Sequence, residues 1–296
     1  MGGEEQYMAW LGRGERLAVS VPAFGLDRPL SVQVLRTGQA PGPHITFLHG
    51  FPTSSWDFAQ VIEQLQDSYR VLAFDFLGFG NSDKPADADY SIHAQADLVE
   101  HLWAREHIEE TVIVAHDYGA SVALELLARR DGSKRGLRGV TFLNGGLYPE
   151  LHRPLFIQKL LVLPVLGSVV TRLVNEKTFS QNMARILSPE HQPTRSEMHA
   201  LWTSVQLRHG HRIYHKLVHY MADRRTHAER WLRALEQGSI PKQFLWGMRD
   251  PVSGAHVAAR LKERLRPLRL VEMHDVGHYP QLEAPERVVQ CLRDWS

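Results

Sequence analysis

The stretch Val112-Ile113-Val114-Ala115-His116-Asp117-Tyr118-Gly119-Ala120 decides the fold prediction. An apolar run leads into a turn in which small residues, Ala115 and Gly119, lie two positions before and after Asp117. A helix-forming run, 121–128, follows at once. Small residues let a strand and a helix approach closely around a turn that holds its central side chain strained and exposed. The pattern therefore predicts a strand, a sharp turn and a helix, with Asp117 presented at the turn.

A strand–turn–helix with this spacing has the form of the nucleophile elbow of α/β-hydrolases, which in most members carries serine. A carboxylate nucleophile forms an alkyl ester instead of an acyl-enzyme. Asp117 therefore favours carbon electrophiles, such as epoxides and alkyl halides, over esters and amides. The alternative is that Asp117 only caps the helix that follows it.

Three further signals occur along the chain in an order that favours the catalytic interpretation. His49-Gly50 follows the apolar run 45–48, where this fold supplies half of its oxyanion hole. Asp250 follows a second apolar run, and His278 comes shortly after the run 270–273. The order nucleophile, acid, histidine is that of the α/β-hydrolase fold.

These motifs resemble those of the aspartate-nucleophile α/β-hydrolases, which include epoxide hydrolases, haloalkane dehalogenases and fluoroacetate dehalogenases. The loop Phe74-Asp75-Phe76-Leu77-Gly78-Phe79-Gly80-Asn81-Ser82-Asp83-Lys84-Pro85 is similar to the loop after their fourth strand. The closest resemblance is to the mesoderm-specific transcript-like proteins, a branch related to epoxide hydrolases. It rests on that loop, on His49 to Trp56, on 144–160 and on Asp250-Pro251, and it extends from about residue 40 to the end.

The order of apolar runs predicts a mostly parallel sheet. Runs 17–21 and 30–34 alternate apolar and polar residues, as an antiparallel opening pair would. Later runs are continuously apolar and separated by helical stretches, which favours a sheet with both faces covered. These runs lie near 44–48, 70–75, 111–116, 138–143, 242–246 and 268–273. We expect an α/β-hydrolase core, 1–145 and 239–296, with a helical cap inserted at 146–238.

Composition narrows the functional classes. Of the 296 residues 43% are hydrophobic, which is enough for a sizeable core, and the net charge of +1 gives no reason to expect nucleic-acid binding. A single cysteine, Cys291, excludes a disulfide within the chain. The sequence shows no apolar stretch long enough to span a membrane and no signal-peptide core at residues 1–6, so we expect a cytoplasmic protein.

The resemblance implies a cofactor-free, two-step hydrolysis of a neutral epoxide. Asp117 would attack an epoxide carbon, and His278 would then activate a water that hydrolyses the ester. Asp250 would orient the imidazole, and the backbone N–H groups of Phe51 and Tyr118 would form the oxyanion hole. Water and the epoxide would be the only small-molecule partners, and a homodimer is compatible with the sequence.

Five other residues are candidates for the acid, for the ring-opening tyrosine or for the substrate pocket. Asp275 is a rival acid, but Asp250 directly follows a predicted strand at the sheet edge where ligands gather. The resemblance implies a cap tyrosine that hydrogen-bonds the epoxide oxygen, and Tyr220 is the candidate. Tyr148 lies where the chain enters the cap, and it is a candidate for the substrate pocket together with His49 and Trp56. No tyrosine lies between Tyr148 and Tyr214, so the second ring-opening tyrosine of epoxide hydrolases has no obvious counterpart.

Two alternatives stay open. The first is a dehalogenase: haloalkane dehalogenases carry a tryptophan after the nucleophile and a second donor after the His-Gly pair, whereas this chain has Tyr118 and Phe51. The second is a catalytically silent member of the fold that binds a partner.

The spacing of His211, His215 and His219 puts them on one face of a predicted helix. No carboxylate or cysteine joins them at ligand spacing, so no metal site is expected.

Overall fold

The structure, a computed structural model, describes residues 1–38, 42–130, 136–163 and 166–295. Its centre is an eight-stranded sheet in the order β1-β2-β4-β3-β5-β6-β7-β8. The strands are β1 (Glu15–Val19), β2 (Leu30–Thr37), β3 (His44–Leu48), β4 (Arg70–Phe74), β5 (Glu110–His116), β6 (Gly136–Leu143), β7 (Lys242–Gly247) and β8 (Arg269–Met273). The pairs β1–β2 and β2–β4 are antiparallel and the others are parallel. The predicted α/β architecture and its antiparallel opening pair are confirmed.

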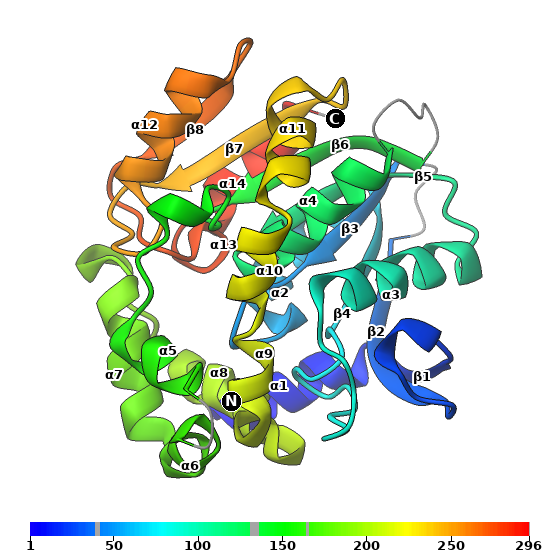
Figure 1. The fold of residues 1–296 in the computed structure, drawn as a ribbon, viewed down its shortest axis with the longest axis vertical. Coiled ribbons are helices and arrows are strands. Elements are labelled where there is room, and N and C mark those ends of the chain that lie inside the picture. Colours follow the sequence, from blue (N-terminus) through cyan, green and yellow to red (C-terminus); the bar gives the residue numbers. More distant parts are fainter. Residues whose placement is uncertain (39–41, 131–135, 164–165, 296) are drawn as a thin grey trace.

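Helices cover both faces of the sheet (Figure 1). On one face lie α3 (Ile92–Arg105), α4 (Tyr118–Arg130) and α11 (Ala228–Gln237); α2 (Ala59–Leu65) and α14 (Pro285–Arg293) lie on the other. Strand β3 shows why such a sheet is stable, because Ile45, Phe47 and Leu48 are buried almost completely. The remaining core helices are α1 (Gly3–Gly12), α12 (Ala255–Arg264) and α13 (Pro280–Glu283).

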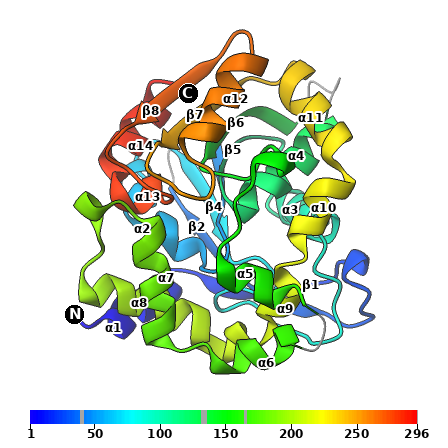
Figure 2. The same ribbon diagram turned by 60° about the vertical axis from the view of Figure 1, so that its left-hand side comes forward.

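Between β6 and β7 the chain leaves the sheet and forms a helical insertion, residues 149–237. Its helices before α11 are α5 (Phe156–Leu161), α6 (Leu166–Leu173), α7 (Glu176–Ile186), α8 (Arg195–Gln206), α9 (Tyr214–Leu217) and α10 (Tyr220–Thr226). Figures 1 and 2 show α5 to α9 gathered at the lower end of the molecule, while α10 and α11 return along the sheet. Helix α8 begins at a capping box, in which Thr194 and Glu197 satisfy each other's backbone N–H groups.

Candidate active site

Asp117 occupies the sharp turn between β5 and α4, as the sequence predicts. Its backbone φ of 41° is left-handed, a costly conformation for a residue with a side chain. Gly119 makes the turn sterically feasible, because a Cβ there would lie 2.2 Å from the carbonyl oxygen of Leu48. The carboxylate is only 4% exposed and receives hydrogen bonds from Phe51 and Arg224. Among the described residues, the Asp117 carboxylate is held by these two donors and does not cap the first turn of α4.

One predicted oxyanion-hole donor lies at the nucleophile. The backbone N–H of Phe51 donates to Oδ2 of Asp117 at 3.3 Å. Tyr118 directly follows the nucleophile, and its hydroxyl donates to the carbonyl oxygen of Tyr90 at 3.4 Å. The Tyr118 hydroxyl is thus occupied by the Tyr90 carbonyl, so the oxyanion-hole role predicted for Tyr118 rests on its backbone N–H group.

His278 and Asp250 form the expected acid–histidine pair. Nδ1 of His278 lies 2.7 Å from Oδ2 of Asp250, and both side chains are buried. Asn144 and Ser253 also donate to Oδ2 of Asp250, at 2.9 and 2.7 Å, which fixes the carboxylate. The rival acid, Asp275, instead pairs with Arg287 at 2.8 Å and with His191 at 3.0 Å. The structure therefore brings Asp250, and not Asp275, to the histidine.

The pKa of His278 is raised to about 8. Burial on its own lowers this pKa, but the charge and hydrogen bond of Asp250 and the charge of Asp117 outweigh it. The pKa of Asp250 is correspondingly lowered to about 2, because burial, which raises it, is outweighed mainly by His278. His278 in the resting site is thus largely an imidazolium at neutral pH.

We expect the pH dependence of ester hydrolysis to follow the protonation state of His278. An alkyl ester on Asp117 removes the carboxylate charge, which contributes to the raised pKa of His278. The pKa of His278 in the intermediate should then lie below about 8. A general base must be neutral, so the hydrolysis rate should rise with pH and level off above that midpoint. Single-turnover decay of the intermediate measures the profile, and a rate that falls as pH rises would contradict it.

A buried arginine beside the nucleophile is a feature that the sequence analysis missed. Nη2 of Arg224, on α10, donates to the backbone oxygen of Asp117 at 2.9 Å and to its Oδ1 at 3.3 Å. Nε donates to Ser121 at 2.7 Å, and the guanidinium lies 4.4 Å from the centre of the Tyr220 ring. Burial raises the pKa of Asp117, but the charges of Arg224 and then of His278 bring it below its ordinary value. Arg224 thus keeps the nucleophile ionised.

Arg224→Met should therefore shift the pH dependence of alkylation upward, since burial would then raise the pKa of Asp117 without this compensation. It should also lower the free energy of unfolding by about 3–5 kcal/mol, the typical cost of breaking a buried ion pair. Arg224→Lys is the matched control, because it keeps the charge but loses the guanidinium's paired contacts to Asp117 and Ser121. An unchanged alkylation profile in Arg224→Met, alongside lower stability, would leave Arg224 a purely structural role.

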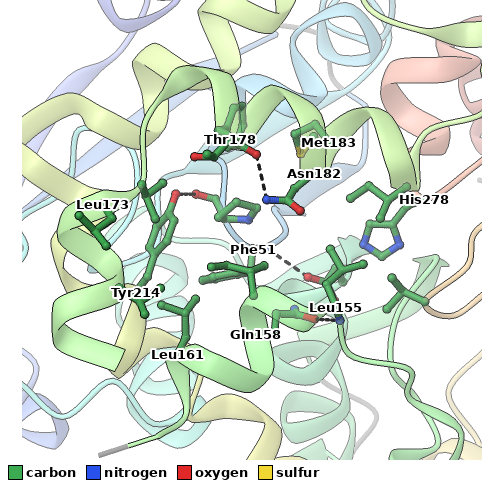
Figure 3. A pocket seen from close by; sticks show the side chains of 18 residues that line it. Phe51, Leu155, Gln158, Leu161, Leu173, Thr178, Asn182, Met183, Tyr214 and His278 are labelled. Carbon is green, nitrogen blue, oxygen red and sulfur yellow. Dashed lines mark hydrogen bonds between the residues drawn. The ribbon is translucent and has the colours of Figure 1, made fainter. Parts of the chain in front are cut away.

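An apolar cavity of about 230 Å³ opens onto Asp117 and His278. Figure 3 shows this cavity from close by, with His278 among its labelled lining residues. Its walls come from loops after the core strands and from α5, α6, α7 and α9. The lining residues are Phe51, Pro52, Asp117, Leu155, Ile157, Gln158, Leu161, Val170, Leu173, Val174, Thr178, Phe179, Asn182, Met183, Ile186, Tyr214, Val252 and His278. The helical insertion thus supplies most of the wall that faces Asp117 and His278.

The three predicted pocket residues lie elsewhere, and this is a correction. His49 is completely buried, and its Nε2 accepts from the backbone N–H of Phe76 at 3.0 Å. Trp56 lines a separate surface pocket beside Glu190 and Glu197. Tyr148 is buried with its ring 5.6 Å from the guanidinium of Arg260. None of the three contacts the cavity above Asp117.

Tyr220 lies close to the site although it does not line the cavity. Its ring is 5.2 Å from that of Tyr118 and 6.1 Å from that of Phe51. Its hydroxyl accepts from Nε2 of Gln158 at 3.5 Å, and burial raises its pKa, so the phenol is neutral. Gln158, which the sequence analysis did not single out, lines the cavity and thus connects Tyr220 to it.

His152 is a second residue without a predicted role. Both ring nitrogens are buried without a hydrogen-bond partner among the described residues. Burial and the charge of Arg224 lower its pKa to about 4, so the ring is neutral. Only the position of His152 in the stretch that carried the family resemblance, 144–160, pointed to it in advance.

The three histidines of the predicted helix do not share one helix. Left-handed backbone at Arg208 and His209 interrupts the segment Leu207–Ile213, which contains His211, and His215 lies in α9. His219 precedes α10. Among the described residues no cluster of histidine, cysteine and carboxylate side chains could hold a metal ion.

Comparison with known proteins identifies the family. The family model for the alpha/beta hydrolase fold matches residues 43–285. The chain belongs to the α/β-hydrolase fold family. It is 39% identical over 250 residues to the mesoderm-specific transcript homolog protein of Bos taurus, covering 81% of this chain and 75% of that one. It is 41% identical over 259 residues to LipZ of Mycobacterium tuberculosis, covering 87% and 89%.

The fold also matches solved structures of this α/β-hydrolase family. The structure superimposes on haloalkane dehalogenase DbeA from Bradyrhizobium elkani with a TM-score of 0.78, 23% identity and coverage of 95% and 97%. The family match and the relatives identify this chain as a hydrolase. No helix in the described ranges combines the length and apolar character needed to cross a bilayer.

Proposed function

We propose that this α/β-hydrolase is an epoxide hydrolase that converts neutral epoxides to vicinal diols through an ester on Asp117. The observation that carries the proposal is a carboxylate at the elbow, with the Phe51 N–H on Oδ2 at 3.3 Å and the His278–Asp250 pair beside the same cavity. A carboxylate in this position can displace an oxygen from a saturated carbon, and its ester carbonyl can then be attacked by water.

In the first step Oδ1 of Asp117 forms a bond to an epoxide carbon while that carbon's bond to the ring oxygen breaks. We assign Oδ1 because Oδ2 already faces the oxyanion donor. The departing oxygen develops negative charge and needs a hydrogen-bond donor. The Tyr220 hydroxyl fits this role, because its contact with Gln158 uses it as an acceptor and leaves its proton for the substrate. Solvent replaces that proton after ring opening.

In the second step His278 removes a proton from water, and the resulting hydroxide attacks Cγ of Asp117. The N–H groups of Phe51 and Tyr118 stabilise the tetrahedral oxyanion. Collapse of this intermediate breaks the bond from Cγ to the substrate oxygen and leaves Asp117 as the carboxylic acid, which loses the proton that came with the hydroxide to solvent and so becomes the carboxylate again. The released alkoxide takes the proton from His278, and the product is a vicinal diol.

The cavity supports a neutral, mostly apolar substrate. Its walls are largely aliphatic and aromatic, and the helical insertion closes over the reacting groups as a cap, which we place at 146–238. Arg224 carries a charge near Asp117, but it does not line the cavity and its Nη2 is engaged with Asp117. Among the residues that line the cavity the only cationic one is His278, and Asp250 already pairs with it, so the cavity favours a neutral substrate over an anionic one.

Dehalogenation is the less favoured function. A leaving halide needs donors beside the nucleophile, but the Phe51 side chain has none and the Tyr118 hydroxyl donates to Tyr90. A parallel assay of styrene oxide, an aliphatic epoxide and a brominated alkane separates the two functions. Diol release with little bromide supports the proposal, whereas bromide release without diol would replace epoxide hydrolysis with dehalogenation. If neither product forms with the intact protein, the catalytic proposal fails.

Tyr220→Phe should slow alkylation by epoxide about 10²-fold, because loss of one donor to a developing oxyanion typically has that effect on the rate. Ester hydrolysis should change little, since the alkoxide forms only in the first step. Tyr214→Phe is a matched control: Tyr214 lines the cavity, but its hydroxyl already donates to the Pro52 carbonyl at 3.3 Å. Single-turnover kinetics measure both steps. Equal alkylation rates in the two variants would remove Tyr220 from the mechanism.

A further inference from the structure

The outer side of α5 and α6 carries an unusual concentration of exposed apolar side chains. Apart from Met1 and Met8, all strongly exposed large hydrophobic residues in the described chain lie in this segment. Phe156 is 75% exposed and Leu173 is 69% exposed. We call this surface the α5–α6 face; it consists of Phe156, Val162, Leu163, Leu166, Val169 and Leu173. Contiguous exposed apolar surface of this kind marks an interaction site.

The α5–α6 face is an ordered surface on a packed helix pair. Leu166, Val169 and Leu173 recur at positions i, i+3 and i+7, so they line one side of α6. On the opposite side Gly167 is buried, and a Cβ there would lie 2.2 Å from the carbonyl oxygen of Leu161 in α5. The two helices therefore pack backbone to backbone and present their apolar side chains to solvent together.

The same two helices form a wall of the cavity above Asp117. Leu161 in α5 and Val170 in α6 line the cavity, and Leu173 belongs to both the cavity wall and the exposed face. Figure 3 shows Leu161 and Leu173 at the cavity. Figures 1 and 2 place α6 at the lower edge of the molecule, away from the sheet. Leu173 thus joins the exposed face of the insertion to the wall of the cavity that contains Asp117.

The charged side chains of the chain segment that carries this face are basic. Residues 151–175 contain Arg153, Lys159 and Arg172 but no aspartate or glutamate. All three basic side chains are exposed, and none forms a salt bridge with another residue in the described part of the chain. Exposed lysine and arginine beside an apolar helix face favour a surface with anionic headgroups over an acyl layer.

A second copy of this chain fits the face less well. In a two-fold symmetric dimer the same patch meets itself, so Lys159 and Arg172 would face like charges. No acidic side chain in 151–175 is available to pair with them. An anionic bilayer removes this conflict, since it accepts the apolar side chains and neutralises the basic ones.

We propose that the α5–α6 face docks onto the surface of an anionic lipid bilayer, with the cavity mouth turned toward the acyl chains. Helices of 6 and 8 residues are too short to span a bilayer and lie in its interface instead. An apolar substrate dissolved in the bilayer then reaches Asp117 without crossing bulk water. Docking itself does not depend on the identity of the reaction.

Flotation of the full chain with vesicles tests the proposal. The vesicles are phosphatidylcholine alone or phosphatidylcholine mixed with phosphatidylglycerol, each at low and high salt. We expect binding to the mixed vesicles that weakens with salt. The combination of Phe156→Ser, Leu163→Ser and Val169→Ser, none of which lines the cavity, should lower the partition coefficient at least about tenfold. Lys159→Gln with Arg172→Gln should lower it on the order of 30-fold at low salt.

Met8→Ser is the matched control, because Met8 is 50% exposed on α1, as Leu163 and Val169 are 47% and 48% exposed on the insertion. It should float like the parent chain, and circular dichroism should show that every variant is folded. Absence of parent binding to any vesicle, or equal binding by the triple variant, would overturn the proposal. Sedimentation velocity showing a parent dimer that the triple variant loses would overturn it in favour of a second copy.

Discussion

Asp117→Ala is expected to lower epoxide turnover by at least about 10⁴-fold, the scale of loss when a nucleophile is removed from an assembled site. Asp250 cannot take its place, because it is held by His278, Asn144 and Ser253. Steady-state diol formation measures the loss. Asp275→Ala is the control, since Asp275 pairs with Arg287 and not with His278, and its turnover should stay close to that of the parent.

The stability of Asp117→Ala must be measured alongside its activity. The substitution leaves Arg224 buried without the carboxylate, although the backbone oxygen of residue 117 and Ser121 still accept from it. Asp117→Asn keeps the shape of the side chain and should be just as inactive in alkylation. A folded Asp117→Asn protein that retained turnover within tenfold of the parent would show that Asp117 is not the nucleophile.

His278→Gln is expected to separate the half-reactions. Alkylation by Asp117 does not require the imidazole, whereas ester hydrolysis loses its base and should slow by at least about 10⁴-fold. A burst of one substrate per protein followed by almost no further product is the expected time course. Equal slowing of both steps would contradict this division of labour between Asp117 and His278.

The parts of this α/β-hydrolase that the sequence predicted are those encoded locally. The elbow needs small residues at 115 and 119, and the structure shows why at Gly119, which packs against the Leu48 carbonyl. The order of Asp117, Asp250 and His278 followed from apolar runs that end in polar residues. Parallel strands place such ends at one edge of a sheet, so sequence order was enough to bring these groups together.

Arg224 could not be predicted in the same way. It lies 107 residues from Asp117 and reaches it only because α10 packs across the elbow. Gln158 contacts Tyr220, 62 residues further along, because α5 and α10 come together within the helical insertion. Contacts that depend on how the insertion packs, on the core or on itself, leave no periodic signal in the sequence.

Two expectations, one about the pocket and one about a helix, failed for identifiable reasons. Tyr148 enters the insertion at the expected place, but its ring turns toward Arg260 on α12 and away from the cavity. The histidine stripe assumed one α-helix, but His211 lies in a 3₁₀ segment that ends at Ile213, His215 lies in α9 and His219 lies just before α10. In both cases the position in the sequence was informative, but the direction of the side chain depended on backbone geometry that the pattern does not encode.

The most direct test of the central claim is the mass of His278→Gln after one exposure to styrene oxide. We expect the intact protein to gain the mass of one substrate, and proteolysis to locate this gain on the peptide that contains Asp117. Addition of Asp117→Asn to the same protein should abolish the gain. A His278→Gln protein that turns over substrate without forming an adduct, or an adduct on a peptide without Asp117, would contradict the covalent mechanism.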